Sequence, residues 1–183
     1  MNDPLNPQDA APRSKLRVWI ARLDSISIWS GKLFAWLIVP MIGALVYEVF
    51  ARYAFAAPTM WAYDTTFMLY GAHFMLGAAF TLAKGAHIRT DFLYRMWSDR
   101  VQATVDLAIY LIFFFPGFAF FLWASAEFAA KSWEQSELII TSPWLPIVYP
   151  FKTVIPLTAA LLMIQGVSES LKCVEAIRQG RWS

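Results

Sequence analysis

Residues 65–83 read TTFMLYGAHFMLGAAFTLA and contain no Asp, Glu, Lys or Arg. An α-helix rises about 1.5 Å per residue, so a run of this length nearly crosses a hydrocarbon core about 30 Å thick. A segment that crosses lipid on its own must satisfy every backbone N–H and C=O internally, which a helix does and a lone strand does not. The pattern therefore predicts a transmembrane helix that begins near Trp61.

Three further blocks of the chain are apolar over similar lengths. Leu107–Ala126 lacks charge over 20 residues, and Leu33–Tyr47 and Thr153–Ser168 lack it over 15 and 16 residues. Only 15% of the 183 residues are charged, against about 25% in soluble domains. We predict an all-α membrane protein with four transmembrane helices, at residues 31–53, 61–83, 101–130 and 146–170.

The 15 Lys and Arg residues are divided unequally between the two ends of these helices. Only Arg52, Lys131 and Lys152 lie at one end, and the other 12 lie at the opposite end. Since Lys and Arg concentrate in cytoplasmic connections, both termini are expected in the cytoplasm. The expected organisation is a cytoplasmic tail with a basic interfacial segment, a four-helix membrane domain and a second cytoplasmic tail, at residues 1–30, 31–172 and 173–183.

The connection at residues 84–100, KGAHIRTDFLYRMWSDR, is too polar to cross a bilayer. Helical spacing places Phe92, Leu93, Met96 and Trp97 on one face, which predicts an in-plane amphipathic helix between the second and third crossings. We name this segment the cytoplasmic strap. Two interpretations remain open: the strap is a rigid strut, or it is a short linker that rests on the membrane.

Three charged residues lie close to the expected outer membrane face. Glu48 precedes Arg52 by one helical turn, an order that suits a salt bridge, and Asp64 follows Trp61 where it could also reach Arg52. One interpretation is a cluster that fixes the first helix against the second. The other is a docking surface for an outside partner. Ion translocation is disfavoured because no chain of acids leads inward.

The sequence contains no pattern typical of an enzyme or a cofactor site. His73 is the only histidine within a crossing, so a bis-histidine haem has no second ligand at comparable depth, and we expect His73 to be a hydrogen-bonded packing residue. There is no nucleophile elbow, zinc-ligand cluster or glycine-rich phosphate loop. The net charge of +2 gives no reason to expect a nucleic-acid surface. We expect no catalytic residue, no cofactor and no metal in this chain.

The second and third predicted crossings differ in the size of their side chains. Gly71, Ala72, Gly77, Ala78 and Ala79 allow close approach of the second helix to its neighbours, which predicts a central position. The third helix carries six phenylalanines between residues 113 and 121, which suits a peripheral position against lipid or a broad partner.

Two stretches follow each other closely in the chain: RYAFAAPTMWAYD at residues 52–64 and GAAFTLAKGAHIRTDFLY at residues 77–94. Together they resemble the small membrane subunit of tripartite ATP-independent periplasmic (TRAP) transporters. The resemblance extends over residues 30–180 in length, layout and inside termini. The positions that match the family pattern are Arg52, Tyr53, Pro58, Trp61, Asp64, Gly77, Ala78, Ala79, His87, Arg89 and Asp91.

The resemblance implies a role in the bacterial inner membrane beside two partners. One is a large multi-helix subunit that binds sodium and substrate and moves like an elevator. The other is a periplasmic protein that captures an organic acid. The small subunit is expected to be non-catalytic, to scaffold the large subunit, to contact membrane lipids and to help dock the binding protein. The strap, anchored by Phe92, Leu93, Met96 and Trp97, would then brace the scaffold.

Two alternatives belong to other classes of protein. A four-helix chain of this size also suits the membrane anchor of a quinone- or haem-linked oxidoreductase. A small homodimeric exporter would need an embedded acid near mid-helix, and Glu48, the only candidate, lies toward one end beside Arg52.

Overall fold

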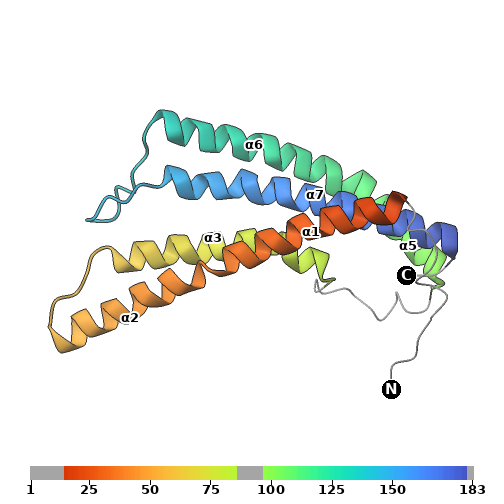
Figure 1. The fold of residues 1–183 in the computed structure, drawn as a ribbon. Helices are drawn as coiled ribbons and strands as arrows, with labels where there is room; N and C mark the ends of the chain where they lie inside the picture. Colours follow the sequence, from red (N-terminus) through yellow and green to blue (C-terminus); the bar gives the residue numbers. More distant parts are fainter. Residues whose placement is uncertain (1–14, 86–96, 181–183) are drawn as a thin grey trace, which may run out of the picture.

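The computed structural model describes residues 15–85 and 97–180. These residues form helices joined by short connections, with one isolated β-bridge between Leu138 and Ile147. Four helical stretches in this part of the chain are long and apolar enough to cross a membrane, which confirms the predicted class. The elements, shown in Figure 1, are α1 (Lys15–Ala35), α2 (Ile38–Ala54), α3 (Ala62–Ala83), α5 (Asp99–Ile109), the π-helix η2 (Tyr110–Phe114), α6 (Phe115–Glu134) and α7 (Tyr149–Gln179).

The helix that contains the first predicted crossing, residues 31–53, begins well before residue 31. Residues 15–35 already form α1, and α2 continues after a short interruption at Trp36 and Leu37. Pro40 explains the interruption, because it has no N–H to offer the carbonyl of Trp36 and its ring crowds that group. The Trp36 carbonyl instead accepts a hydrogen bond from the N–H of Val39, three residues on, at an N···O distance of 3.1 Å.

The third crossing is a single long stretch with a change of helix type inside it. Helix α5 passes into η2 and then α6, so the stretch covers Asp99–Glu134 and exceeds the predicted 101–130. Pro116 lies just after η2 and cannot donate to the carbonyl of Ile112. The wider π turn accommodates this missing bond.

Helix α7 extends beyond the predicted 146–170 at its C-terminal end. It continues to Gln179, into the expected C-terminal tail, and Gly180 ends it in a left-handed conformation at φ 73°. The N–H of Gly180 donates to the carbonyl of Ala176 at 2.8 Å, as in a helix C-cap that glycine favours.

The centre of the bundle is α7, and the prediction that the second crossing would be central is therefore wrong. Helix α7 packs against α1, α3, α5 and α6, whereas α3 packs against α1, α2 and α7. Small side chains on α7 permit this close packing, among them Ala159, Ser168 and Ala176. On α3, Ala72 and Ala79 are buried as expected, but nothing lies within 4 Å of a Cβ built on Gly77.

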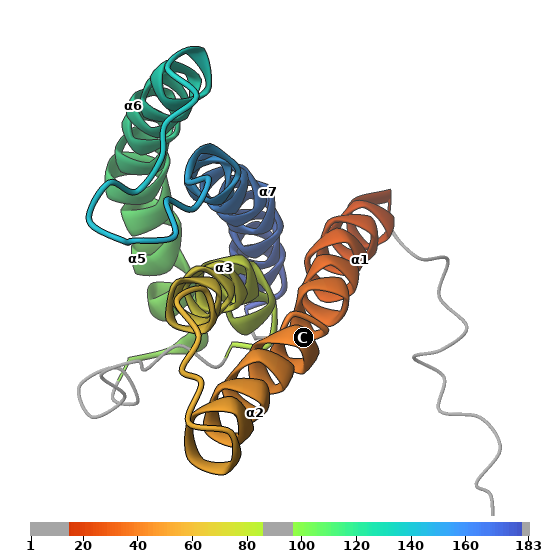
Figure 2. The ribbon, with the colours of Figure 1, turned by 90° about the vertical axis from the view of Figure 1, so that its left-hand side faces the viewer.

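The two hairpins spread apart (Figures 1 and 2). The α2–α3 connection and the α6–α7 connection lie at the same end of the molecule, and the α6–α7 loop reaches back to the first turn of α3. Helix α1 crosses obliquely over α3 and α7, and the described helices come together toward the opposite end. Within the described residues, the third crossing packs on α7 and lies at the periphery, as predicted.

Candidate functional site

The connection between α2 and α3 is held by Glu48, Arg52 and Thr59, which we name the α2–α3 clamp. The Arg52 Nε donates to Glu48 Oε1 at 2.9 Å, which matches the predicted salt bridge between adjacent turns. The other Glu48 oxygen accepts hydrogen bonds from the backbone N–H of Thr59, at 2.9 Å, and from the Thr59 hydroxyl. One carboxylate therefore ties the end of α2 to the chain that leads into α3.

Trp61 lies beside this clamp and Asp64 lies outside it. The Trp61 ring packs against Tyr47 of α2 with centroids 5.5 Å apart. The Asp64 carboxylate accepts a hydrogen bond from the Ser142 hydroxyl in the α6–α7 loop. The expectation that Asp64 would reach Arg52 is wrong, because its position in the first turn of α3 directs it toward the other hairpin.

The α6–α7 loop is fixed to the helix ends by a second ion pair. The Lys152 ammonium of α7 lies 2.5 Å from Glu137 Oε2 and 4.1 Å from the centroid of the Phe128 ring of α6. The hydrogen bond from Lys152 lowers the pKa of the Glu137 carboxyl below its ordinary value of 4.5. Together with the Asp64–Ser142 bond, this pair links the loop to α3, α6 and α7.

A larger polar network joins α1 to α7, and we name it the α1–α7 joint. Asp24 of α1 accepts hydrogen bonds from Ser168 at 2.6 Å and from Gln165 at 2.9 Å. Both donors belong to α7 and have no exposed surface. The Lys172 ammonium completes the contact at 2.9 Å from the second Asp24 oxygen.

The α1–α7 joint continues along α7 on both sides of Lys172. Glu169 lies 2.8 Å from the Lys172 ammonium and also accepts from Gln165 at 2.9 Å. Farther toward the C-terminus, Arg17 Nε lies 2.5 Å from Glu175 Oε1, and the Glu175 side chain is only 8% exposed. Carboxylates this well enclosed are stable only with such partners, so the network specifies how α1 sits on α7.

Sequence reasoning missed the α1–α7 joint. The pattern of residues 15–30 favours a tail and a basic interfacial segment, because four ionisable residues interrupt its apolar positions. One signal could have pointed to the contact. Arg17 and Asp24 lie about two helical turns apart, and Ser168 and Glu175 have the same spacing, so the two pairs could meet across antiparallel helices.

His73 contributes to packing, as predicted. Its Nδ1 lies 3.2 Å from the carbonyl oxygen of Phe34, so the imidazole links α3 to the end of α1. The predicted in-plane helix lies outside the described residues up to Met96, and so do the other strap residues His87, Arg89 and Asp91. Trp97 is described, just before α5, and its side chain is 46% exposed.

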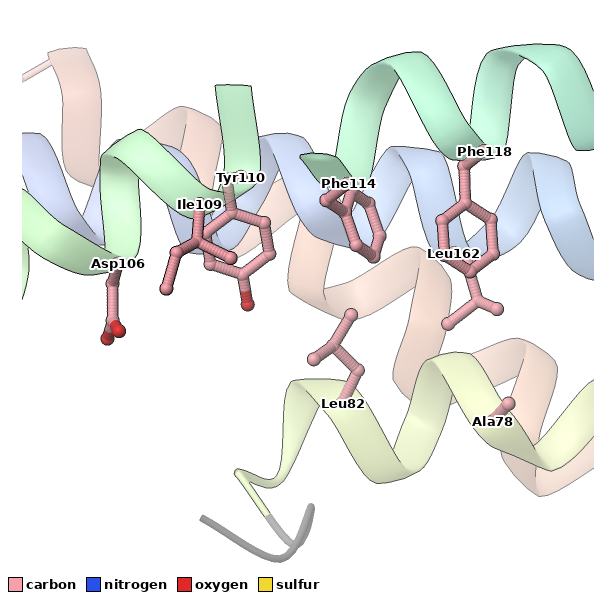
Figure 3. A pocket seen from close by; sticks show the side chains of 8 residues that line it. All are labelled: Ala78, Leu82, Asp106, Ile109, Tyr110, Phe114, Phe118 and Leu162. Carbon is pink, nitrogen blue, oxygen red and sulfur yellow. The ribbon is translucent and has the colours of Figure 1, made fainter. Parts of the chain in front are cut away.

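An apolar cavity of about 400 Å³ lies between α3 and the third crossing (Figure 3). Asp106 lies at one end, and the rest of the wall is mainly apolar, with Phe114 and Phe118 on one side and Ala78 and Leu82 on the other. Helices α3 and α6 each pack against α7, and this cavity occupies the space between them.

The geometry of these sites holds helices together and does not assemble reacting groups. In residues 15–85 and 97–180, no three His, Cys, Asp or Glu side chains are grouped so that they could hold a metal ion. The carboxylates of the α2–α3 clamp and the α1–α7 joint accept hydrogen bonds from Lys, Arg, Thr, Ser or Gln side chains. Such arrangements fix one helix relative to another.

The comparison with protein families identifies the chain. Residues 41–176 match the model described as "Tripartite ATP-independent periplasmic transporters, DctQ component". No curated protein and no solved structure matches the chain. The match covers more than half of the 183 residues and includes α3, α5, η2, α6, most of α2 and most of α7. The chain therefore belongs to the DctQ family: it is a multi-pass small membrane component of a TRAP transporter and not an enzyme.

Proposed function

We propose that this chain is the scaffold subunit of a sodium-coupled TRAP transporter for organic acids. In this proposal it supports the stationary part of a large elevator-type subunit, which binds sodium and substrate, and it helps dock a periplasmic substrate-binding protein. Both termini lie in the cytoplasm of a bacterium and the two hairpin loops face the periplasm. The observation that carries the proposal is the DctQ match over residues 41–176.

The packing supports a rigid role. The α1–α7 joint fastens the first helix to the last, and the α2–α3 clamp fastens α2 to the start of α3. A scaffold must resist the forces produced when its partner moves, and enclosed polar contacts have one preferred geometry. Since these contacts hold three of the four crossings in place, we infer that the helices keep their arrangement during transport.

The proposal is tested by removing the chain from cells that carry the other two components. Uptake of a radiolabelled organic acid should be lost, while the purified binding protein still captures its ligand with unchanged affinity. Re-expression of the chain should restore uptake. Uptake that continues at the original rate without the chain would contradict the proposal.

The docking role is tested by Arg52→Ala. The Arg52 side chain is 54% exposed in the last turn of α2, so part of its guanidinium is available to a partner. We expect the variant to weaken capture of the binding protein by the assembled membrane complex, without changing that protein's affinity for ligand. Lys131→Ala is the control, because Lys131 is an exposed cation at the same end and forms its own pair with Glu127. Normal docking in Arg52→Ala would show that the α2–α3 clamp only joins helices.

A further inference from the structure

Helix α1 has two faces with different chemistry. The inward face contains Ile20, Ser27 and Gly31, which are buried or lie against neighbouring helices, and Asp24 of the α1–α7 joint. The outward face follows a regular spacing of three and four residues. Its six exposed members, which we name the α1 stripe, are Trp19, Arg22, Ile26, Trp29 and Leu33 of α1 and Trp36, which directly follows α1.

The charge of this outward surface is entirely basic. Asp24 is the only acid in α1, and it is engaged by Ser168, Gln165 and Lys172 on the other face. Arg22 lies 5.8 Å from the centroid of the Trp19 ring, and Lys32, beside the stripe, lies 5.6 Å from that of Trp29. A cation over an indole face is stabilised by the ring and can still bind an anion on its open side.

The depth of α1 in the membrane follows from its contact with α3. A Cβ built on Gly31 would lie 2.4 Å from the Cβ of Phe80, which belongs to the last turn of α3. Helix α3 has 22 residues and so spans about 33 Å, close to the thickness of the hydrocarbon core. Its end at Ala83 therefore lies at the membrane surface, and residues 15–30 of α1 extend from that level along α7.

Basic residues lie at this level and along the part of α1 that extends from it. Lys84 follows α3 directly and lies 5.9 Å from the centroid of the Phe80 ring. Lys32 is adjacent to Gly31 in sequence, and Arg22 lies ten residues earlier on the oblique helix (Figures 1 and 2). Tryptophan side chains favour the headgroup layer, and Lys or Arg beside them attract phosphate groups of anionic lipids.

We propose that the α1 stripe, with Lys32, binds the headgroups of anionic phospholipids. The observation behind the proposal is charge complementarity: the outward face of α1, which passes the membrane surface near Gly31, carries cations and tryptophans and no acid. Phosphate oxygens are held by Arg22 and Lys32, while Trp29 and Leu33, which lie nearer the hydrocarbon core than Arg22, contact the upper acyl chains. The consequence is that the tilt of α1, and through the α1–α7 joint the position of α7, depends on lipid charge.

The test measures lipid retention by the full-length purified chain. The chain in detergent receives equal amounts of phosphatidylglycerol and phosphatidylcholine, and bound lipids are counted by native mass spectrometry. We expect the wild type to prefer phosphatidylglycerol, and Arg22→Gln and Lys32→Gln each to reduce the preference about five-fold. Lys131→Gln is the matched control, since it removes one exposed cation at the opposite end of the molecule.

Two further measurements identify the ligand. Ile26→Lys adds a cation to the stripe and should raise the preference for phosphatidylglycerol. Inorganic phosphate at the same concentration as the lipid should not displace the bound phosphatidylglycerol. Circular dichroism confirms that each variant keeps its helix content. Equal binding of the two lipids by the wild type, or an unchanged preference in both Gln variants, would overturn the proposal. A dimer that the Gln variants dissociate, without lipid preference, would assign the stripe to a second copy and would also overturn it.

Discussion

Asp24 and Lys172 form the central pair of the α1–α7 joint, with side chains 22% and 27% exposed. We expect Asp24→Ala to lower the free energy of unfolding by about 2 kcal/mol, below the roughly 3–5 kcal/mol for a fully buried pair. The loss arises because Ser168, Gln165 and Lys172 each lose a hydrogen-bond acceptor. Thermal unfolding in detergent measures the change.

Glu127→Gln supplies the control for that experiment. The Glu127–Lys131 pair is also an ion pair, but its side chains are 50% and 63% exposed. Because water screens such an exposed pair, removing it should change the unfolding temperature much less than Asp24→Ala does. Equal effects of the two substitutions would contradict a structural role for the α1–α7 joint.

Glu137 makes the α6–α7 loop sensitive to acid. Its folded pKa is lowered from 4.5 by Lys152, so the pair stabilises the loop fully above pH 4.5 and less as the pH falls through the folded pKa. We expect hydrogen exchange in residues 135–148 to be slow at pH 7 and to quicken below about pH 4, after correction for the intrinsic rate.

In Glu137→Gln, the loop should exchange faster at pH 7 and lose this additional dependence on acid, because the variant side chain does not titrate. A variant with the wild-type pH profile would show that another group controls the loop. Lys152 would keep its contact with Phe128 in either case.

Individual residues differed in how well they could be predicted. The Glu48–Arg52 pair follows from helical spacing, because both residues lie on one helix. Thr59 could not be predicted as a partner, since the turn after α2 brings its N–H to Glu48. The α1–α7 joint connects residues far apart in the chain, and no local spacing by itself encodes that contact.

At the scale of elements, the α1–α3 crossing depends on the absence of a side chain at Gly31. We expect Gly31→Ala to lower the free energy of unfolding by about 1–3 kcal/mol, because the new methyl would meet the Phe80 Cβ at 2.4 Å. A Cβ atom moves only with its backbone, so the two helices must separate. Chemical or thermal unfolding of the purified chain measures the effect.

Gly117→Ala is the matched control for the crossing. Nothing lies within 4 Å of a Cβ at Gly117, so the substitution should be neutral or stabilise the helix by up to about 1 kcal/mol. Equal changes in the free energy of unfolding for Gly31→Ala and Gly117→Ala would contradict the close contact between α1 and α3.

The ends of a helix could be predicted where the apolar run in the sequence ends at the same residues as the helix. The expected 61–83 agrees closely with α3, because charge or polarity bounds that run on both sides. The start of α1 was missed because its charges suggested a tail and a basic interfacial segment, whereas α7 supplies partners for Arg17 and Asp24. The central place of α7 was missed because its small residues are mixed with polar ones.

At the scale of the whole molecule, two hairpins spread from the end where α1 meets α7 (Figure 1). The number of crossings could be predicted from the length of the apolar runs, but their arrangement depends on contacts between distant segments. The outward surfaces of α2, α3 and α6 carry large exposed apolar side chains, as a protein surrounded by lipid and partner helices requires. These surfaces are available to lipid and to the large subunit that, in our proposal, this chain supports.

The most direct test of this role is reconstitution in proteoliposomes with a sodium gradient and the loaded binding protein outside. The chain alone should carry no solute, the large subunit alone should give little or no uptake, and the two together should restore sodium-dependent uptake. Solute transport by this chain alone, or full uptake by the large subunit without it, would contradict the account.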